Sequence, residues 1–144
     1  MSDILIVDDE RDIRELVSDI LEDEGYTTRL AGTSDECMAE INSEPPGLLI
    51  LDIWLKDSAM DGIDILKLVK REHPEVPIVI ISGHGNIEIA VAAIRQGAYD
   101  FIEKPFTPER LLDSVRRAQD KRRLVCENRQ LREQFTRKGR IESM

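Results

Sequence analysis

The chain has 144 residues, of which 41% are hydrophobic, and this length suits one domain with a packed core rather than two. No apolar stretch approaches the roughly 20 residues that cross a bilayer, so we expect a soluble, cytoplasmic protein without membrane contact. The net charge of −9 conceals an asymmetry, because residues 114–144 carry ten Lys or Arg against four Asp or Glu. The remaining body is strongly acidic, which disfavours nucleic-acid binding and favours cations or basic partners. Cys37 and Cys126 have no motif partner, which favours thiols over a disulfide.

Short apolar runs alternate with helical patterns along the first half of the chain. Residues 4–7 are rich in β-branched side chains and predict a strand buried on both faces. The next segment predicts a helix that ends near Gly25, and its apolar stripe consists of Ile13, Leu16, Val17, Ile20 and Leu21. Residues 27–31 predict a weaker strand. A capping-box pattern that begins at Thr33 then predicts a helix that stops before Pro45.

The second half of the chain continues the alternation. Its expected elements are strand 48–51, helix 62–71, strand 78–81, helix 86–96, strand 99–103 and a helix that starts at Thr107. Five strand–helix units in a row predict an α/β fold with a single doubly wound parallel five-stranded sheet and five helices. Ligands of such open sheets bind outside the carboxyl ends of the strands, so a site is expected just after the strands.

Polar side chains stand where the predicted strands end. Asp8 and Asp9 follow the first strand, and the third, fourth and fifth strands end at Asp52, Ser82 and Lys104. Two adjacent carboxylates alone also suit a solvated loop, but the coincidence at four strand ends favours a site. Clustered carboxylates suit Mg²⁺, and an aspartate beside the metal can attack phosphorus to form an aspartyl-phosphate. The ammonium and the hydroxyl would then bind phosphoryl oxygens.

These motifs resemble the receiver domains of two-component response regulators. The resemblance covers residues 3 to about 119 and rests on Ile-Val-Asp8-Asp9-Glu, Leu-Ile-Leu-Asp52, Asp61-Gly62, Ser82-Gly83, Gly97-Ala98 and Lys104-Pro105-Phe106. It implies a flavodoxin-like, CheY-like fold for a domain spanning residues 1–119. The segment between Asp52 and Asp61 is longer than the family's usual loop and lacks its usual proline.

The resemblance also implies a role for each residue at the strand ends. Asp52 would be the phosphoacceptor, with Lys104 and Ser82 as its catalytic partners. Asp9, Asp52 and the main-chain carbonyl of Trp54 would bind Mg²⁺ directly, and Asp8 would support the metal through water. The phosphoryl group would come from a sensor histidine kinase. A chain of this kind is not an enzyme, because it catalyses only its own phosphorylation and dephosphorylation.

The switch of the family has two candidate residues here. Ser82 would move toward the phosphate, and Phe101, three residues before the lysine, would turn inward. Phe101 is alternatively a plain strand residue that packs on the fourth helix. The output surface would consist of the fourth helix, the fifth strand and the fifth helix.

The segment 120–144 predicts a helical linker. Leu124, Asn128, Leu131 and Phe135 follow heptad spacing with Asn at a core position, a pattern typical of a two-stranded coil, although a solvated basic helix fits it equally. The linker resembles that of nitrogen-regulation activators of the NtrC and NtrX type. Such a parent would carry an AAA+ ATPase and a DNA-binding domain, both absent here, to act on sigma-54 RNA polymerase. A homodimer is expected.

Three other functions compete with this interpretation. Haloacid-dehalogenase-type phosphatases share the Asp nucleophile, Mg²⁺, hydroxyl and Lys, but place a second Asp where this chain has Trp54. A stand-alone receiver acting through protein contacts only would not need the extended last helix. Nucleic-acid binding would depend on the basic tail and would be strongly salt-dependent.

Overall fold

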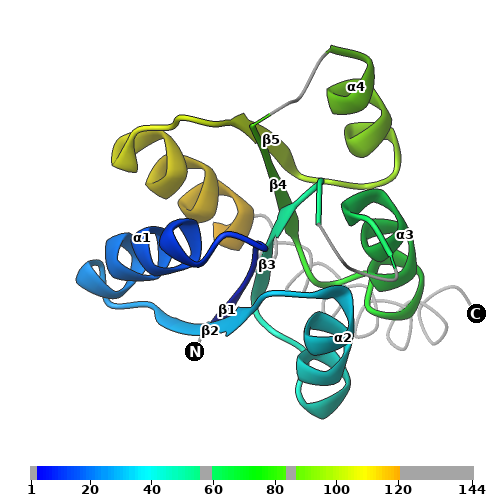
Figure 1. Cartoon of the computed structure of the whole chain (residues 1–144), viewed down its shortest axis with the longest axis horizontal. Coiled ribbons are helices and arrows are strands. Elements are labelled where there is room, and N and C mark those ends of the chain that lie inside the picture. The colour runs from blue at the N-terminus through cyan, green and yellow to red at the C-terminus, as the bar shows by residue number, and fades with distance from the viewer. Residues whose placement is uncertain (1–2, 56–59, 84–86, 121–144) are drawn as a thin grey trace, which may run out of the picture.

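The computed structural model describes residues 3–55, 60–83 and 87–120 (Figure 1). Its elements in order are β1 (Asp3–Val7), α1 (Arg11–Asp23), β2 (Thr27–Ala31), α2 (Ser34–Ser43), β3 (Leu48–Asp52), α3 (Gly62–Glu72), β4 (Ile78–Ser82), α4 (Ile87–Arg95) and β5 (Asp100–Glu103). A fifth helix covers residues 108–120. The predicted start of α4 at residue 86, Cys126 and the predicted linker from residue 121 lie outside the described residues.

The five strands form one parallel sheet in the order β2-β1-β3-β4-β5. The chain leaves β1 toward β2 on one side and resumes with β3 on the other, so the strand order reverses between β1 and β3. This topology confirms the predicted doubly wound sheet. Its register pairs Val7 with Leu51, Asp52 with Ile81 and Ser82 with Glu103. The carboxyl ends of β1, β3, β4 and β5, where the polar residues stand, are therefore aligned.

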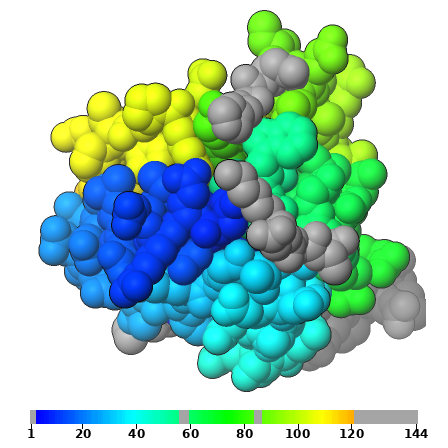
Figure 2. Space-filling view, in the orientation of Figure 1, coloured from blue at the N-terminus to red at the C-terminus, as the bar shows by residue number. Residues whose placement is uncertain are grey.

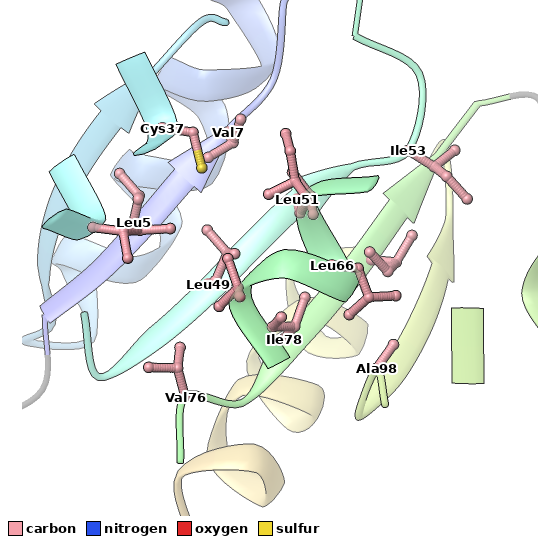
Figure 3. Packing of buried hydrophobic residues seen from close by; sticks show 14 of the residues in the cluster. Leu5, Val7, Cys37, Leu49, Leu51, Ile53, Leu66, Val76, Ile78 and Ala98 are labelled. Carbon is pink, nitrogen blue, oxygen red and sulfur yellow. The ribbon is translucent and has the colours of Figure 1, made fainter. Parts of the chain in front are cut away.

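Helices cover both faces of the sheet. Figures 1 and 2 show α1 beside the fifth helix on one face, and α2, α3 and α4 lie on the other. Successive strand residues point to opposite faces, so Leu5 and Val7 join the core under α2, α3 and α4 (Figure 3), whereas Ile4 and Ile6 join the core under α1 and the fifth helix. Both faces of the inner strands β1, β3 and β4 are buried, which explains why these strands are almost continuous apolar runs.

The predicted helix boundaries are built from local hydrogen bonds. The side chains of Thr33, Asp61 and Thr107 accept the backbone N–H three residues ahead, at 3.2, 2.9 and 3.1 Å. Gly25 and Gly97 end their helices with φ of 92° and 110°, a conformation that favours glycine.

One residue of the predicted apolar stripe of α1 is exposed and needs correction. Leu16 is 48% exposed, because one residue corresponds to about 100° of helix rotation and places it beside the face centred on the buried Val17.

Cys37 is a free, buried thiol as predicted, and burial raises the pKa of Cys37 to about 12. Within the described parts of the chain, no helix is both long and apolar enough to span a bilayer.

Candidate functional site

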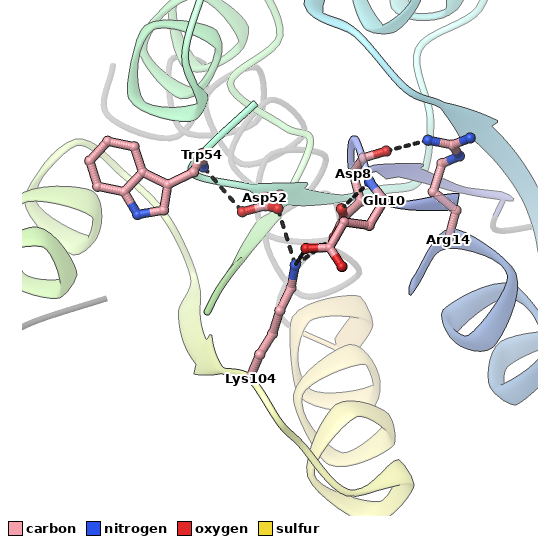
Figure 4. A network of polar contacts seen from close by, with 6 residues as sticks. All are labelled: Asp8, Glu10, Arg14, Asp52, Trp54 and Lys104. Atoms are coloured by element: carbon pink, nitrogen blue, oxygen red, sulfur yellow. Dashed lines mark hydrogen bonds and ion pairs between the residues drawn. The ribbon is translucent and has the colours of Figure 1, made fainter. Parts of the chain in front are cut away.

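Lys104 lies between two buried carboxylates at the carboxyl edge of the sheet (Figure 4). Its Nζ is 2.9 Å from Oδ2 of Asp8 and 3.1 Å from Oδ2 of Asp52, and its side chain is 13% exposed. The three residues are far apart in the sequence and meet because β1, β3 and β5 end at the same edge of the sheet. A single ammonium therefore bridges the two carboxylates.

Backbone groups hold the other oxygen of each carboxylate. The N–H of Trp54 donates to Oδ1 of Asp52 at 3.1 Å, and the N–H of Glu10 donates to Oδ1 of Asp8 at 2.8 Å. The guanidinium of Arg14, on α1, donates to the main-chain carbonyl of Asp8 at 2.6 Å. Both carboxylates are thus fixed in orientation before any ligand binds.

Burial dominates the electrostatics of this pair. It raises the pKa of Asp8 from 3.8 to about 6, and it raises the pKa of Asp52 as well. Burial alone would lower the pKa of Lys104, but its hydrogen bond to Asp8 and the charge of Asp52 outweigh burial and raise that pKa. The site therefore keeps its ammonium charged and has more buried negative charge than one ammonium balances.

A cluster of acidic side chains adjoins the pair. Carboxylate oxygens of Asp8, Asp9 and Glu10 lie within 4.8 Å of one another, with Asp8 buried, Asp9 half-buried and Glu10 exposed. Oxygen ligands at this spacing suit a hard divalent cation, so the donor set fits the metal expected from the sequence. Asp52 is connected to this cluster through Lys104, which contacts both Asp8 and Asp52.

The remaining predicted site residues occupy distinct positions. Ser82 is fully buried at the end of β4, and its carbonyl accepts the N–H of Lys104 at 2.7 Å. Phe101 is half-buried and packs against the core under α2, α3 and α4. Trp54 is 45% exposed, and its ring points away from Asp52 (Figure 4).

Sequence reasoning gave no role in the site to three residues, two of which, Glu10 and Gly62, belong to the motifs of the resemblance. Glu10 joins the acidic cluster, and its place directly after two aspartates was an available signal. Gly62 packs on the backbone that follows Asp52, and its N–H donates to the carbonyl of Ile53 at 3.0 Å. Arg14 belongs to the polar face of α1, and no local pattern predicts its contact with the carbonyl of Asp8.

Comparisons with known proteins show which family the chain is similar to. The response regulator receiver domain model matches residues 4–116. The nitrogen assimilation regulatory protein NtrX of Azorhizobium caulinodans is 59% identical over 131 residues, which are 91% of this chain and 29% of that protein. This chain therefore spans less than a third of the length of that relative.

Solved structures of similar chains share the fold. NtrX from Brucella abortus in complex with ATP is 55% identical, with a TM-score of 0.87, over 90% of this chain and 29% of that one. The receiver domain of the same NtrX is 57% identical, with a TM-score of 0.79, over 81% and 98% of the two chains. The beryllofluoride-activated NtrC4 receiver domain dimer is 38% identical, with a TM-score of 0.80, over 85% and 99%. The chain therefore belongs to the response regulator receiver domain family and is similar to the receiver domains of NtrX- and NtrC-type regulators.

Proposed function

We propose that this chain accepts a phosphoryl group on Asp52 from a phosphohistidine of a sensor histidine kinase. A carboxylate oxygen of Asp52 forms the new bond to phosphorus, and the bond from phosphorus to the kinase imidazole nitrogen breaks, which returns a free imidazole. The observation that carries the proposal is the Lys104 ammonium between Asp8 and Asp52. This ammonium is placed to bind a phosphoryl oxygen once Asp52 carries the phosphoryl group as an acyl phosphate.

The other residues at the sheet edge divide the remaining tasks. Asp9, Asp52 and the Trp54 main-chain carbonyl would hold Mg²⁺, with Asp8 supporting it through water. When bound, the metal supplies positive charge that neutralises the phosphoryl oxygens. The hydroxyl of Ser82 would bind a further phosphoryl oxygen and draw its loop toward the site, and Phe101 would turn inward in response.

The output of this switch would be a surface formed by α4, β5 and the fifth helix. Ile87, Val91 and Ile94 of α4 are 82%, 42% and 47% exposed, which supports a contact surface there. The beryllofluoride-activated NtrC4 receiver domain is a dimer in solution, which supports dimerisation of this chain, and we place the contact on this surface.

The parent protein would be a cytoplasmic transcription regulator. Residues 1–119 would form its receiver domain and residues 120–144 its helical linker, of which residues 121–144 lie outside the described residues. The complex of Brucella abortus NtrX with ATP supports an ATPase unit in the parent. Contacts with DNA and sigma-54 RNA polymerase would belong to those other domains, and this chain would act as a signalling module without turning over a substrate.

Intact-mass measurement tests the phosphoacceptor. After incubation with acetyl phosphate and Mg²⁺, the wild-type chain should gain one phosphoryl mass, and EDTA should abolish the gain. Asp52→Asn should gain none, whereas Asp19→Asn, an exposed position on α1, should behave as wild type. Equal phosphorylation of Asp52→Asn would refute the proposed site, and no adduct on wild type would mean a receiver that works through protein contacts alone.

A further inference from the structure

Gly62 is the first residue of α3 and lies directly on the backbone that leaves the Asp52 strand. A Cβ atom at residue 62 would be 2.4 Å from the Cα of Ile53 and 2.6 Å from the carbonyl oxygen of Asp52. Non-bonded carbon atoms prefer about 3.5–4.0 Å, and both contacted atoms are main-chain atoms that cannot turn aside. Only glycine allows this approach without moving residues 52 and 53.

The contact is also a hydrogen bond. The N–H of Gly62 donates to the carbonyl of Ile53 at 3.0 Å, and the N–H of Ile53 donates to the carbonyl of Ile81 in β4 at 3.1 Å. The residue after Asp52 is therefore held by α3 on one side and by β4 on the other. Ile53 itself is 2% exposed, so packing restrains it further.

This contact joins the end of β3 to the start of α3, on either side of the long loop between them. The described main chain continues from Ile53 to Leu55 and resumes at residue 60, just before the contact of Gly62. The contact holds Ile53 and, through it, the end of β3 at Asp52, and the Trp54 N–H is tied to Asp52 by its hydrogen bond to Oδ1 at 3.1 Å.

We propose that Gly62 is a positioning residue for the phosphoacceptor and metal site, and that its contact with Ile53 uncouples this site from the length of the loop between them. The inference rests on the proposed function, because it concerns how Asp52 and the main chain of Trp54 are held for Mg²⁺. Gly62 touches neither the metal nor the phosphoryl group and acts through the backbone of residues 52 and 53.

Other glycines of the chain provide matched controls. Gly25 ends α1 with φ of 92°, and a Cβ atom there would have no neighbour within 4 Å. Alanine at this position is strained but remote from the site. At Gly83, next to Ser82, a Cβ atom would meet Lys104 at 3.6 Å, which is an ordinary contact.

The test measures Mg²⁺ binding by calorimetry and by the fluorescence of Trp54, the single tryptophan of the chain. Gly62→Ala should bind Mg²⁺ about 10- to 100-fold more weakly, as expected when a residue that supports a metal ligand is lost. It should also be phosphorylated more slowly by acetyl phosphate. Gly25→Ala should lose thermal stability and keep wild-type Mg²⁺ affinity, so that a general loss of stability cannot account for the effect. Gly83→Ala should also keep Mg²⁺ affinity.

A second variant decides the matter if Gly62→Ala does not fold. Two glycines inserted between Asp57 and Ser58, in the segment outside the described residues, should leave Mg²⁺ affinity unchanged. Weaker binding after this insertion, or wild-type binding by a folded Gly62→Ala protein, would overturn the inference and leave the proposed function intact. Absence of Mg²⁺ binding by the wild-type chain would instead overturn the proposed function, and the inference with it.

Discussion

Lys104 balances two buried carboxylates with one positive charge, and this imbalance sets the behaviour of the site before any ligand binds. Its ammonium lies about equally far from Asp8 and Asp52, at 2.9 and 3.1 Å. Removal of the ammonium leaves buried carboxylates without a cation, which is more costly than loss of an exposed ion pair. The strength of this effect can be measured on the protein without phosphate.

Lys104→Met should lower the free energy of unfolding by about 3 kcal/mol in EDTA. Mg²⁺ should recover part of this loss, because it supplies positive charge to the same carboxylates. Urea unfolding with EDTA or Mg²⁺ measures both effects, and Lys67→Met, at an exposed position of α3, is the control that should show neither. A deficit that Mg²⁺ does not reduce would contradict this account.

The raised pKa of Asp8 predicts an unusual dependence of stability on pH. Burial raises this pKa from 3.8 to about 6, so the folded metal-free chain binds the proton more strongly than the unfolded chain does. The free energy of unfolding should therefore decrease as pH rises through the window from about 4 to about 6. Asp8→Asn should remove part of this decrease, because Asp52 contributes the rest.

Urea unfolding in EDTA across this pH window provides the measurement. Asp19→Asn, at an exposed position of α1, should retain the wild-type slope. Stability that rises with pH over the same window would show that the attraction of Lys104 outweighs burial.

At the scale of secondary structure, Asp100 joins β5 to the fifth helix. Its carboxylate accepts hydrogen bonds from both terminal nitrogens of Arg110, at 2.9 and 3.2 Å, and from Ser114 at 2.9 Å. Arg110 also donates to the carbonyl of Phe101 at 3.3 Å. The strand that carries the proposed switch residue is thereby tied to the helix that precedes the predicted linker.

Asp100→Asn should lower the free energy of unfolding by roughly 2 kcal/mol, because charged hydrogen bonds are lost. Burial alone would raise the pKa of Asp100, but the hydrogen bonds from Arg110 and Ser114 outweigh it and lower that pKa. The contribution is therefore present above the ordinary aspartate value of 3.8 and is lost as pH falls below it.

Asp113→Asn is the matched control in the same helix. Asp113 pairs with Arg117 at 3.2 Å on the exposed surface, and its loss should cost only about 0.3–0.5 kcal/mol. Equal losses for the two variants, compared by urea unfolding near neutral pH, would contradict the proposed connection between β5 and the fifth helix.

At the scale of the whole molecule, the two edges of the sheet differ in their exposed apolar residues. The edge at β5 is flanked by α4, which exposes Ile87, Val91 and Ile94. The opposite edge strand, β2, exposes Leu30 to 43%. Three aliphatic side chains on one helix, at spacings of four and three residues, form a continuous stripe, whereas one exposed leucine is ordinary for a soluble surface.

Replacement of Val91 and Ile94 by Gln should weaken self-association of the phosphorylated chain. Each buried aliphatic side chain contributes about 1.5 kcal/mol or more, so loss of both should raise the dissociation constant of the dimer at least about a hundredfold. Light scattering before and after treatment with acetyl phosphate provides the measurement. Leu30→Gln should leave association unchanged, and a larger effect of Leu30→Gln would move the interface to the β2 edge.

The sequence alone determined the features that depend on near neighbours along the chain. The apolar runs specified β1, β3 and β4, because a strand covered on both faces must be apolar at nearly every position. The edge strands β2 and β5 are partly exposed and gave weaker patterns. Thr33, Asp61 and Thr107 cap their helices through hydrogen bonds that span three residues. The residues at the ends of the strands, and with them the candidate site, followed from the same local patterns together with the rule for open parallel sheets.

The tertiary structure alone decided the features that depend on distant residues. The strand order places Lys104 beside Asp8 and Asp52, and the burial that raises their pKa values comes from the packing of the whole sheet edge. Leu16 lies on an exposed face, although its spacing fits the apolar stripe of α1. Gly62 meets the backbone of Ile53 only because α3 folds back onto the end of β3. Helical periodicity and strand patterns specify the conformation of a segment, whereas distances between segments are set by how their faces pack.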